Sequence, residues 1–282
     1  MTGSDASGLA EPLQVLYEAD NVTNGMLPEP LPSWYGGSLR FPTPRLVANF
    51  VSSLDGVVAL PGLTQSNKLI SAGNEADRFV MGLLRAFADV VLIGSGTLRG
   101  SPTTVWTAPH AYPPGGQAFG KLRQRQGQPA APELAIMTGS GAIDVHHPGI
   151  QAGSVVLTTR QGASALGDRL PASCDLVVLP GTAQVDPTAA VHALTARGHQ
   201  LILSEAGPTV FGALLDAGLV DELFYTLSPR LAGRSPRSPR PGLVEGAELL
   251  PAVRCDSRLA SVRRHRDHLL LRYILDDETE AR

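Results

Sequence analysis

Short apolar runs rich in β-branched residues recur along the chain, and segments of helical or polar character separate most of them. Runs of this length that are bounded by turn residues are typical of buried β-strands. Strands that alternate with helices favour a mainly parallel, twisted sheet with helices on both faces. We therefore expect an α/β fold with strands at 46–51, 57–60, 90–93, 134–138, 155–158, 176–179, 201–204 and 222–227.

Capping residues and apolar spacing indicate the helices between these strands. Asn74 can cap a helix over 74–88, which carries one apolar face. Asp77 favours the positive, N-terminal end of the same helix. A second helix follows the pair Asp186-Pro187, and a third covers 210–217.

The two ends of the chain depart from this alternation. Two final apolar runs, 258–263 and 268–275, flank a polar turn and predict an antiparallel C-terminal hairpin. Residues 1–44 are polar and then rich in proline, which predicts a partly flexible N-terminal arm, part of which packs on the body. The pattern shows no internal repeat and no second core, so we expect a single domain over 45–282.

Charge balance and the scarcity of cysteine argue against several classes of protein. Lysine and arginine total 23, and aspartate and glutamate total 26, which argues against a strongly basic nucleic-acid-binding protein. Two cysteines cannot build a disulfide framework, and the histidines lack zinc-binding spacing, so we expect no metal and a reducing, cytoplasmic setting. No stretch is long and apolar enough for a membrane span, and no signal peptide is visible, so we expect no membrane partner.

The segment 99–132 is dense in glycine and proline, and it is longer than an ordinary connection. Segments of this kind in compact domains are usually binding loops, lids or disordered chain. We expect a loop that borders a binding site and that a short basic helix at 119–125 interrupts.

Three polar or glycine-rich segments follow predicted strands: 52–55, 94–97 and 205–209. Ligands of open α/β sheets bind beyond the carboxyl ends of the strands, so we expect these segments to meet along one edge of the sheet. The run Gly94-Ser95-Gly96-Thr97 lacks the spacing of the dinucleotide fingerprint, and we expect no strong helix after it. It is either a tight turn or a turn whose amides bind an anion.

The segment 205–209 is the most specific of the three. Gly207 allows a close approach of the backbone, and Pro208 begins a helix whose free amides can bind a phosphate or pyrophosphate. Glu205, at the end of a strand, either binds a polar substrate or is a solvated turn residue. Asp55, in the run Ser-Leu-Asp-Gly, is either a turn former or part of the same site.

Together these segments resemble the riboflavin-biosynthesis pyrimidine reductase family, whose fold is like that of dihydrofolate reductase. The resemblance rests on motifs that follow one another in order at 52–56, 84–89, 94–99, 205–209, 214–223 and 229–233. It implies an NADPH-dependent oxidoreductase, usually a homodimer, that acts on a small molecule. The family reduces the ribosyl group of 5-amino-6-(5-phosphoribosylamino)uracil to ribityl, and hydride moves to the ribosyl C1.

The resemblance also implies which residues form the site. Glu205 would be catalytic and would bind the substrate together with Asn49, Ser66 and Arg85. NADPH would contact Val51, Ser53, Asp55, Gly94, Gly96, Thr97, Ser101, Ser140, Gly207, Pro208, Thr209 and Val210.

The sequence departs from the family pattern mainly on the substrate side. The family often has lysine at the position of Asn49 and tryptophan at that of Lys68. It often has an Ala-Asp-Asp-Pro or Ala-Asp-Asn-Pro turn where this chain has Gly100-Ser101-Pro102, and a substrate-binding arginine near 105–108.

These departures leave two alternatives open. One is an NADPH-dependent reductase of another substrate such as dihydrofolate, and the other is a non-catalytic NADP-binding regulatory protein. The zinc-binding H-x-E and P-C-x-x-C motifs of the deaminase that often accompanies the family do not occur, so we expect a stand-alone reductase module.

Overall fold

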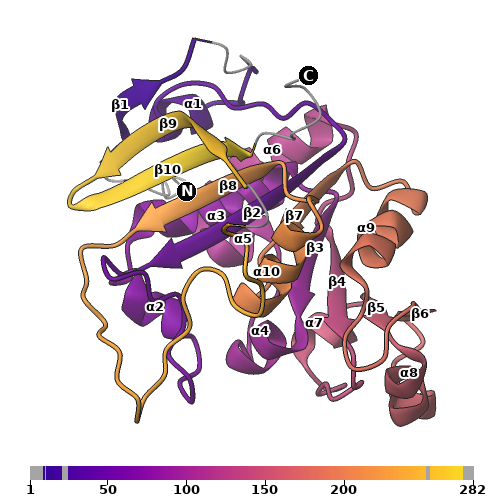
Figure 1. Cartoon of the computed structure of the whole chain (residues 1–282). Helices are drawn as coiled ribbons and strands as arrows, with labels where there is room; N and C mark the ends of the chain where they lie inside the picture. The colour runs from indigo at the N-terminus through magenta and orange to yellow at the C-terminus, as the bar shows by residue number, and fades with distance from the viewer. Residues whose placement is uncertain (1–8, 10, 21–24, 252–254, 276–282) are drawn as a thin grey trace, which may run out of the picture.

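The described part of the chain contains one continuous sheet. The computed structural model describes residues 9, 11–20, 25–251 and 255–275. Its strands are β1 (Gln14–Glu18), β2 (Arg45–Ser52), β3 (Val90–Gly94), β4 (Glu133–Thr138), β5 (Val155–Thr158), β6 (Asp175–Val178), β7 (Leu201–Ser204), β8 (Glu222–Leu227), β9 (Ser257–His265) and β10 (His268–Leu275). Hydrogen bonds join them in the order β1-β9-β10-β8-β2-β7-β3-β4-β5-β6 (Figure 1).

The sheet is parallel over its larger part and antiparallel at one side. From β8 through β2, β7, β3, β4 and β5 to β6, neighbouring strands run parallel. β9 and β10 form an antiparallel hairpin that pairs with β8. β1 of the N-terminal arm pairs antiparallel with β9 and forms the edge. The mainly parallel α/β sheet with an antiparallel C-terminal hairpin, as predicted from the sequence, is confirmed.

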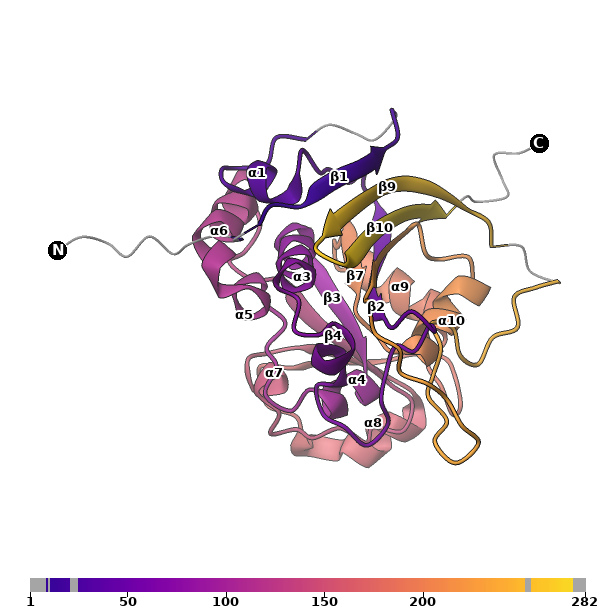
Figure 2. The ribbon, with the colours of Figure 1, turned by 90° about the vertical axis from the view of Figure 1, so that its left-hand side faces the viewer.

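Helices cover both faces of this sheet. They are α1 (Leu31–Tyr35), α2 (Ser66–Ile70), α3 (Glu75–Phe87), α4 (Ser95–Gly100), α5 (Ala108–Ala111), α6 (Gly116–Arg125), α7 (Pro148–Gln151), α8 (Arg160–Leu166), α9 (Pro187–Ala196) and α10 (Pro208–Asp216). Figure 2 shows α3, α5 and α6 on one side of the sheet, and α9 and α10 on the other. Within the described residues, no helix has both the length and the apolar character needed to cross a membrane.

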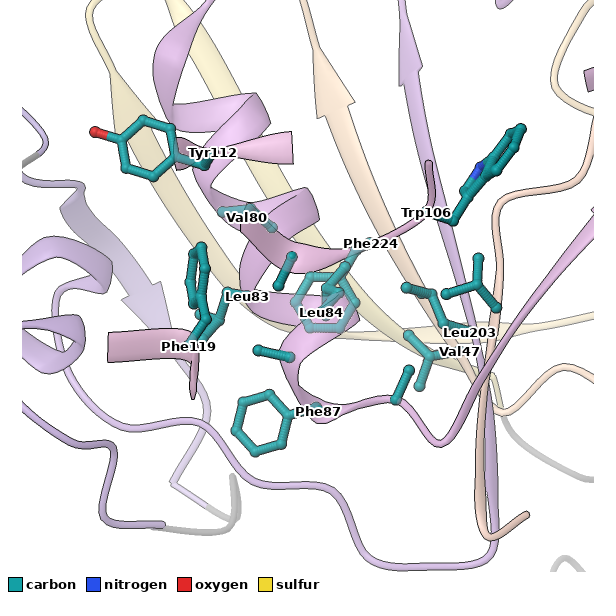
Figure 3. Packing of buried hydrophobic residues seen from close by; sticks show 14 of the residues in the cluster. Val47, Val80, Leu83, Leu84, Phe87, Trp106, Tyr112, Phe119, Leu203 and Phe224 are labelled. Atoms are coloured by element: carbon teal, nitrogen blue, oxygen red, sulfur yellow. The ribbon is translucent and has the colours of Figure 1, made fainter. Parts of the chain in front are cut away.

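The central strands bury side chains on both faces, which divides the core into two clusters. In β3, Val91 and Ile93 belong to the cluster beneath α3 and α6, while Val90 and Leu92 belong to the cluster beneath α9 and α10. This period of two follows from the pleat of a strand, in which successive side chains point to opposite faces. In the first cluster, side chains of α3 gather with those of β2, β7 and β8 (Figure 3).

Three segments differ from what the sequence predicts. Residues 57–60 form no strand, because the amides of Val57 and Val58 donate to Ser53 and to the Pro241 carbonyl instead of to a neighbouring strand. The segment 99–132 is more regular than a loop, since it contains α5, a 3-10 turn and all of α6. A short helix, α4, begins directly after β3, where the sequence predicts only a turn.

The first turn of α3 is tied to the C-terminal hairpin. Asn74 caps the helix, since its Oδ1 accepts hydrogen bonds from the amides of Ala76 at 2.9 Å and Asp77 at 3.1 Å. Its Nδ2 donates to Nδ1 of His265 at 3.2 Å and of His268 at 2.9 Å. Burial lowers the pKa of both imidazoles, which keeps their Nδ1 atoms available as acceptors. The hairpin thereby helps to fix where α3 begins.

The other end of α3 is closed by a buried arginine from α6. Nη1 of Arg123 donates to the carbonyls of Arg85, Ala86 and Ala88 at 3.1, 3.4 and 2.7 Å, and its Nε donates to that of Pro129 at 2.6 Å. A cation is favoured at a helix C-terminus by the helix dipole. Burial lowers the pKa of Arg123 to about 10, so the guanidinium stays charged at neutral pH.

We expect Arg123→Met to lower the free energy of unfolding by about 2 kcal/mol, because the carbonyls at the end of α3 lose their buried donor. Urea unfolding followed by circular dichroism measures the change. Arg125→Met is the matched control, since Arg125 is exposed on the same helix, and we expect its effect to stay within about 0.5 kcal/mol. Equal effects of the two substitutions would show that the Arg123 hydrogen bonds do not stabilise the fold.

Candidate functional site

A cavity of about 680 Å³ lies at the carboxyl ends of the central strands. Its wall includes residues 49–51 of β2, residues 205–208 after β7, and Gly96 and Thr97 after β3. The rest of the wall comes from α2, α3, α4, α5 and the connections that flank them. β2, β7 and β3 are consecutive in the sheet, which is why segments distant in the sequence meet here.

Most of the residues that the family resemblance places in the site line this cavity. The substrate-side residues that line it are Asn49, Ser66, Arg85 and Glu205. The cofactor-side residues that line it are Val51, Gly96, Thr97, Ser101, Gly207 and Pro208. The cofactor-side residues outside its wall are Ser53, Asp55, Gly94, Ser140, Thr209 and Val210. Two of the three segments that follow strands, 94–97 and 205–209, thus contribute to one cavity, and the third, 52–55, does not.

Arg85 and Glu205 form an ion pair in the wall. Nε of Arg85 donates to Oε1 at 2.8 Å, and Nη2 donates to Oε2 at 2.6 Å. The side chains are 3% and 10% exposed, so this two-pronged pair is largely shielded from water. Nη1 of Arg85 also donates to the carbonyl of Thr107 at 3.3 Å, which holds the guanidinium from α5's side. The pair joins α3 to the end of β7 and fixes the direction of both carboxylate oxygens.

Asp77 is a second carboxyl group in the wall. It lies in the first turn of α3 and is only 6% exposed. Burial raises the pKa of Asp77 to about 6, against the opposing effect of a hydrogen bond with Thr226 and the charge of Arg78. The nearby charge of Glu205 raises this pKa further. A carboxyl group with such a pKa can gain or lose a proton near neutral pH, which is the property of a general acid or base.

The first turn of α10 begins at the cavity without a side-chain cap. Gly207 occupies the N-cap position, and Pro208 follows it at the start of the helix. A Cβ added to Gly207 would meet Thr97 Oγ1 at 3.8 Å as its nearest neighbour, so the backbone has open space beside it. The first amides of a helix carry its positive dipole end, and an anion can bind them.

Asp55 joins two segments outside the cavity. Its carboxylate accepts hydrogen bonds from the Ser53 hydroxyl at 2.6 Å and from the amides of Ala232 and Gly233 at 2.9 and 2.7 Å. These donors, led by the Ser53 hydroxyl, hold the pKa of the Asp55 carboxyl well below its usual range. The contacts hold the connection after β8 against the turn after β2.

Five charged or titratable wall residues are absent from the sequence-based site: Lys68, Asp77, Arg78, Arg99 and His110. For Arg78 the sequence does contain a signal, because it precedes Arg85 by two helical turns and therefore shares its face of α3. His110 lies in the segment predicted as a loop, where no periodicity indicates the direction of a side chain. Asp77 acquires its unusual proton affinity from burial, which local sequence does not show.

Comparison with protein-family models identifies one family for this chain. A model of the RibD C-terminal domain family matches residues 44–264, which confirms the resemblance inferred from the motifs. No match is found among curated proteins.

Solved structures with the same fold include three reductases or relatives of reductases. A pyrimidine reductase-like protein from Corynebacterium diphtheriae has a TM-score of 0.65 at 21% identity, over 83% of this chain and 92% of that chain. RibD from Acinetobacter baumannii has a TM-score of 0.61 at 18% identity, over 83% of this chain but 59% of that chain. A riboflavin biosynthesis reductase from Saccharomyces cerevisiae has a TM-score of 0.57 at 15% identity, over 86% and 94% of the two chains. At these identities the likeness shows a shared fold.

We expect Asp77→Asn to stabilise the protein at pH 7 and to flatten its stability between about pH 4 and 6. A folded-state pKa raised from 3.8 to about 6 means that the folded protein binds a proton that the unfolded chain has lost. The parent protein therefore loses stability as the pH rises through this range, by up to roughly 3 kcal/mol for a shift of this size. Urea unfolding across the range measures the difference, and parallel pH curves for parent and variant would contradict it.

Proposed function

Because the chain belongs to the RibD C-terminal domain family, we propose that it is an NADPH-dependent pyrimidine reductase of the riboflavin pathway. In this proposal the substrate is a phosphorylated ribosylaminopyrimidine, and its ribosyl group is reduced to ribityl by hydride transfer to C1. One arrangement carries the proposal: an ion-paired carboxylate and a protonatable carboxyl group line the same cavity as the uncapped start of α10.

The wall at α10 fits the diphosphate of NADPH. Pro208 has no amide hydrogen, so the donors suited to phosphate oxygens are the amides of Thr209 and Val210, which directly follow the wall residues. Gly207 leaves the room that a close approach needs. Thr97 supplies a hydroxyl and Arg99 a positive charge in the same wall. When bound there, NADPH would supply the hydride. The contacts that the resemblance implies for the other cofactor-side residues stay predictions.

The protein's own groups can serve the rest of the reaction. Reduction of a C=N bond adds a hydride to carbon and a proton to nitrogen, so that C=N becomes CH–NH. Asp77 in its protonated form can deliver the proton, because its pKa of about 6 lets it reload from water near neutral pH. Glu205 has both carboxylate oxygens engaged by Arg85, so we assign it the binding and orientation of a polar substrate group.

Dihydrofolate is the second candidate substrate, because it presents a reducible C=N bond of the same kind. The buried carboxyl group of Asp77 favours it equally, since the proton transfer is the same in both reductions. The homodimer and the cytoplasmic location implied by the resemblance and the composition stay predictions.

We expect the purified protein to oxidise NADPH in the presence of the ribosylaminopyrimidine phosphate. The loss of the nicotinamide absorbance measures this reaction. Glu205→Gln is expected to lower kcat/KM roughly tenfold or more, because a charge-assisted contact at the substrate is lost. The same variant should bind NADPH within about twofold of the parent, a change of less than 0.5 kcal/mol. Turnover of dihydrofolate alone would select the second candidate. NADPH binding with no turnover of either compound would leave the regulatory alternative.

We expect Gly207→Ala to weaken NADPH binding roughly tenfold, measured by calorimetric titration, because the new methyl group occupies the space beside the α10 amides. The fold should accept the change, since the nearest neighbour of the new Cβ is 3.8 Å away and the φ angle is −69°. Gly120→Ala on α6 is the matched control, because its Cβ meets nothing within 4 Å. Unchanged affinity in Gly207→Ala would place the cofactor elsewhere.

A further inference from the structure

One end of the cavity carries cationic side chains that pair with no carboxylate in the described part of the chain. We propose that Lys68, Arg78 and His110 form a subsite for an anionic group of the substrate, either a phosphate monoester or a carboxylate. The inference rests on the proposed function for the reaction itself. It assigns the anionic group of the substrate to residues outside the set that the family resemblance implies.

The three residues come from three elements around the cavity. Lys68 lies on α2, Arg78 on α3 and His110 on α5, and all three line the cavity while remaining exposed. They are close enough to affect one another: burial lowers the pKa of His110, and the charges of Arg85, Lys68 and Arg78 lower it further. An anion placed among them would relieve this mutual repulsion.

Arg78 is held so that its planar end stays available. Its Nε donates to the carbonyl of Ala111 at 3.1 Å, which sets the guanidinium beside α5. Its two Nη groups make no hydrogen bond within the described residues. A guanidinium with two free parallel donors is suited to the paired oxygens of a phosphate or carboxylate.

The helix α3 sets the distance from this subsite to the reacting end of the cavity. Arg78 and Arg85 lie on one face of the helix, two turns and roughly 10 Å apart along its axis. Met81 lies between them on that face and also lines the cavity. The reacting group of a substrate would lie at Glu205, the partner of Arg85. An anionic group separated from it by a sugar or a ring could then reach Arg78.

The charge balance of the wall favours an anionic ligand. Among the described wall residues, the four cationic side chains are Lys68, Arg78, Arg85 and Arg99, and the two acidic ones are Asp77 and Glu205. Arg85 neutralises Glu205, and the raised pKa of Asp77 leaves it partly protonated near neutral pH. The cavity thus keeps positive charge although the chain has a formal net charge of −3, and such a cavity attracts anions.

This subsite accounts for a departure from the family pattern. The chain has Asn49 where the family often has lysine, and residues 105–108 include no arginine. Lys68 stands where the family often has tryptophan, and Arg78 and His110 approach the same space from α3 and α5. Positive charge that is missing at the family's usual positions is supplied by other elements.

The subsite is tested by following the His110 imidazole in an NMR pH titration, with its resonance assigned by comparison with His110→Gln. The probes are ribose 5-phosphate and p-aminobenzoylglutamate, and ribose and p-aminobenzamide are their uncharged counterparts. A bound anion should raise the pKa of His110, because it stabilises the imidazolium, and the uncharged probes should leave it unchanged. The probe whose effect on the His110 pKa saturates at the lower concentration shows whether phosphate or carboxylate is the preferred group.

Variants decide whether the three named residues form the subsite. Lys68→Met and Arg78→Met should each weaken the affinity for the preferred anion roughly tenfold, because each removes charge-assisted contacts. Lys121→Met is the matched control, since Lys121 is the other lysine of the chain and is exposed on α6 away from the wall. A His110 pKa that no anion moves, or equal anion affinity in all three variants, overturns the subsite.

NADPH titration of the same samples separates this inference from the proposed function. NADPH-dependent turnover without any anion effect on His110 would reject the subsite and leave the reductase. An anion effect that depends on Lys68 and Arg78, without NADPH binding, would reject the reductase and keep the subsite.

Discussion

Burial of the central strands on both faces decides where this protein can place charge. Every residue of β3 and β7 is buried, so a charged side chain within either strand would lose its water without gaining a partner. Ionisable groups appear where the strands end, and Glu205 is the first residue beyond β7. Even there Glu205 is only 10% exposed, and Arg85 from the neighbouring helix neutralises it. The ion pair with Arg85 thus offsets the cost of burying the Glu205 carboxylate, and it also fixes this part of the cavity wall.

The helix that supplies Arg85 also organises most of the remaining chemistry. Asp77, Arg78 and Arg85 all belong to α3, so one helix positions a titratable carboxyl group, the Arg78 guanidinium and the ion pair with Glu205. Both ends of this helix are fixed by side chains, Asn74 at the beginning and Arg123 at the end. By fixing the ends of α3, these two residues hold its wall side chains at the spacing that a ligand requires.

Local sequence patterns were sufficient for the elements whose cause is local. The strands β2 to β5, the capped start of α3 and the proline that begins α10 follow from periodicity and capping between near neighbours. Residues 57–60 have strand-like composition, yet Pro241 supplies a hydrogen-bond partner from far along the chain. α4 is too short to show an amphipathic period.

The features of the site also fall into those that local sequence shows and those that depend on tertiary structure. The turn from Glu205 to Pro208 is visible in the sequence, because a strand end, a glycine and a helix start are all local features. The proton affinity of Asp77 depends on burial and on Thr226 of β8, and the charges around His110 come from two other helices. These are tertiary effects, and they set the protonation and the charge of the cavity wall, which local motifs do not show.

The amide of Asn74 has a consequence beyond its own helix. It bonds at once to the start of α3 and to two imidazoles of the hairpin at the far end of the chain, 191 and 194 positions away. A substitution of His265 or His268, which end β9 and begin β10, would therefore remove a hydrogen bond at the first turn of α3, where Asp77 and Arg78 lie. The position of these two wall residues thus depends on hydrogen bonds to a hairpin whose histidines do not line the cavity.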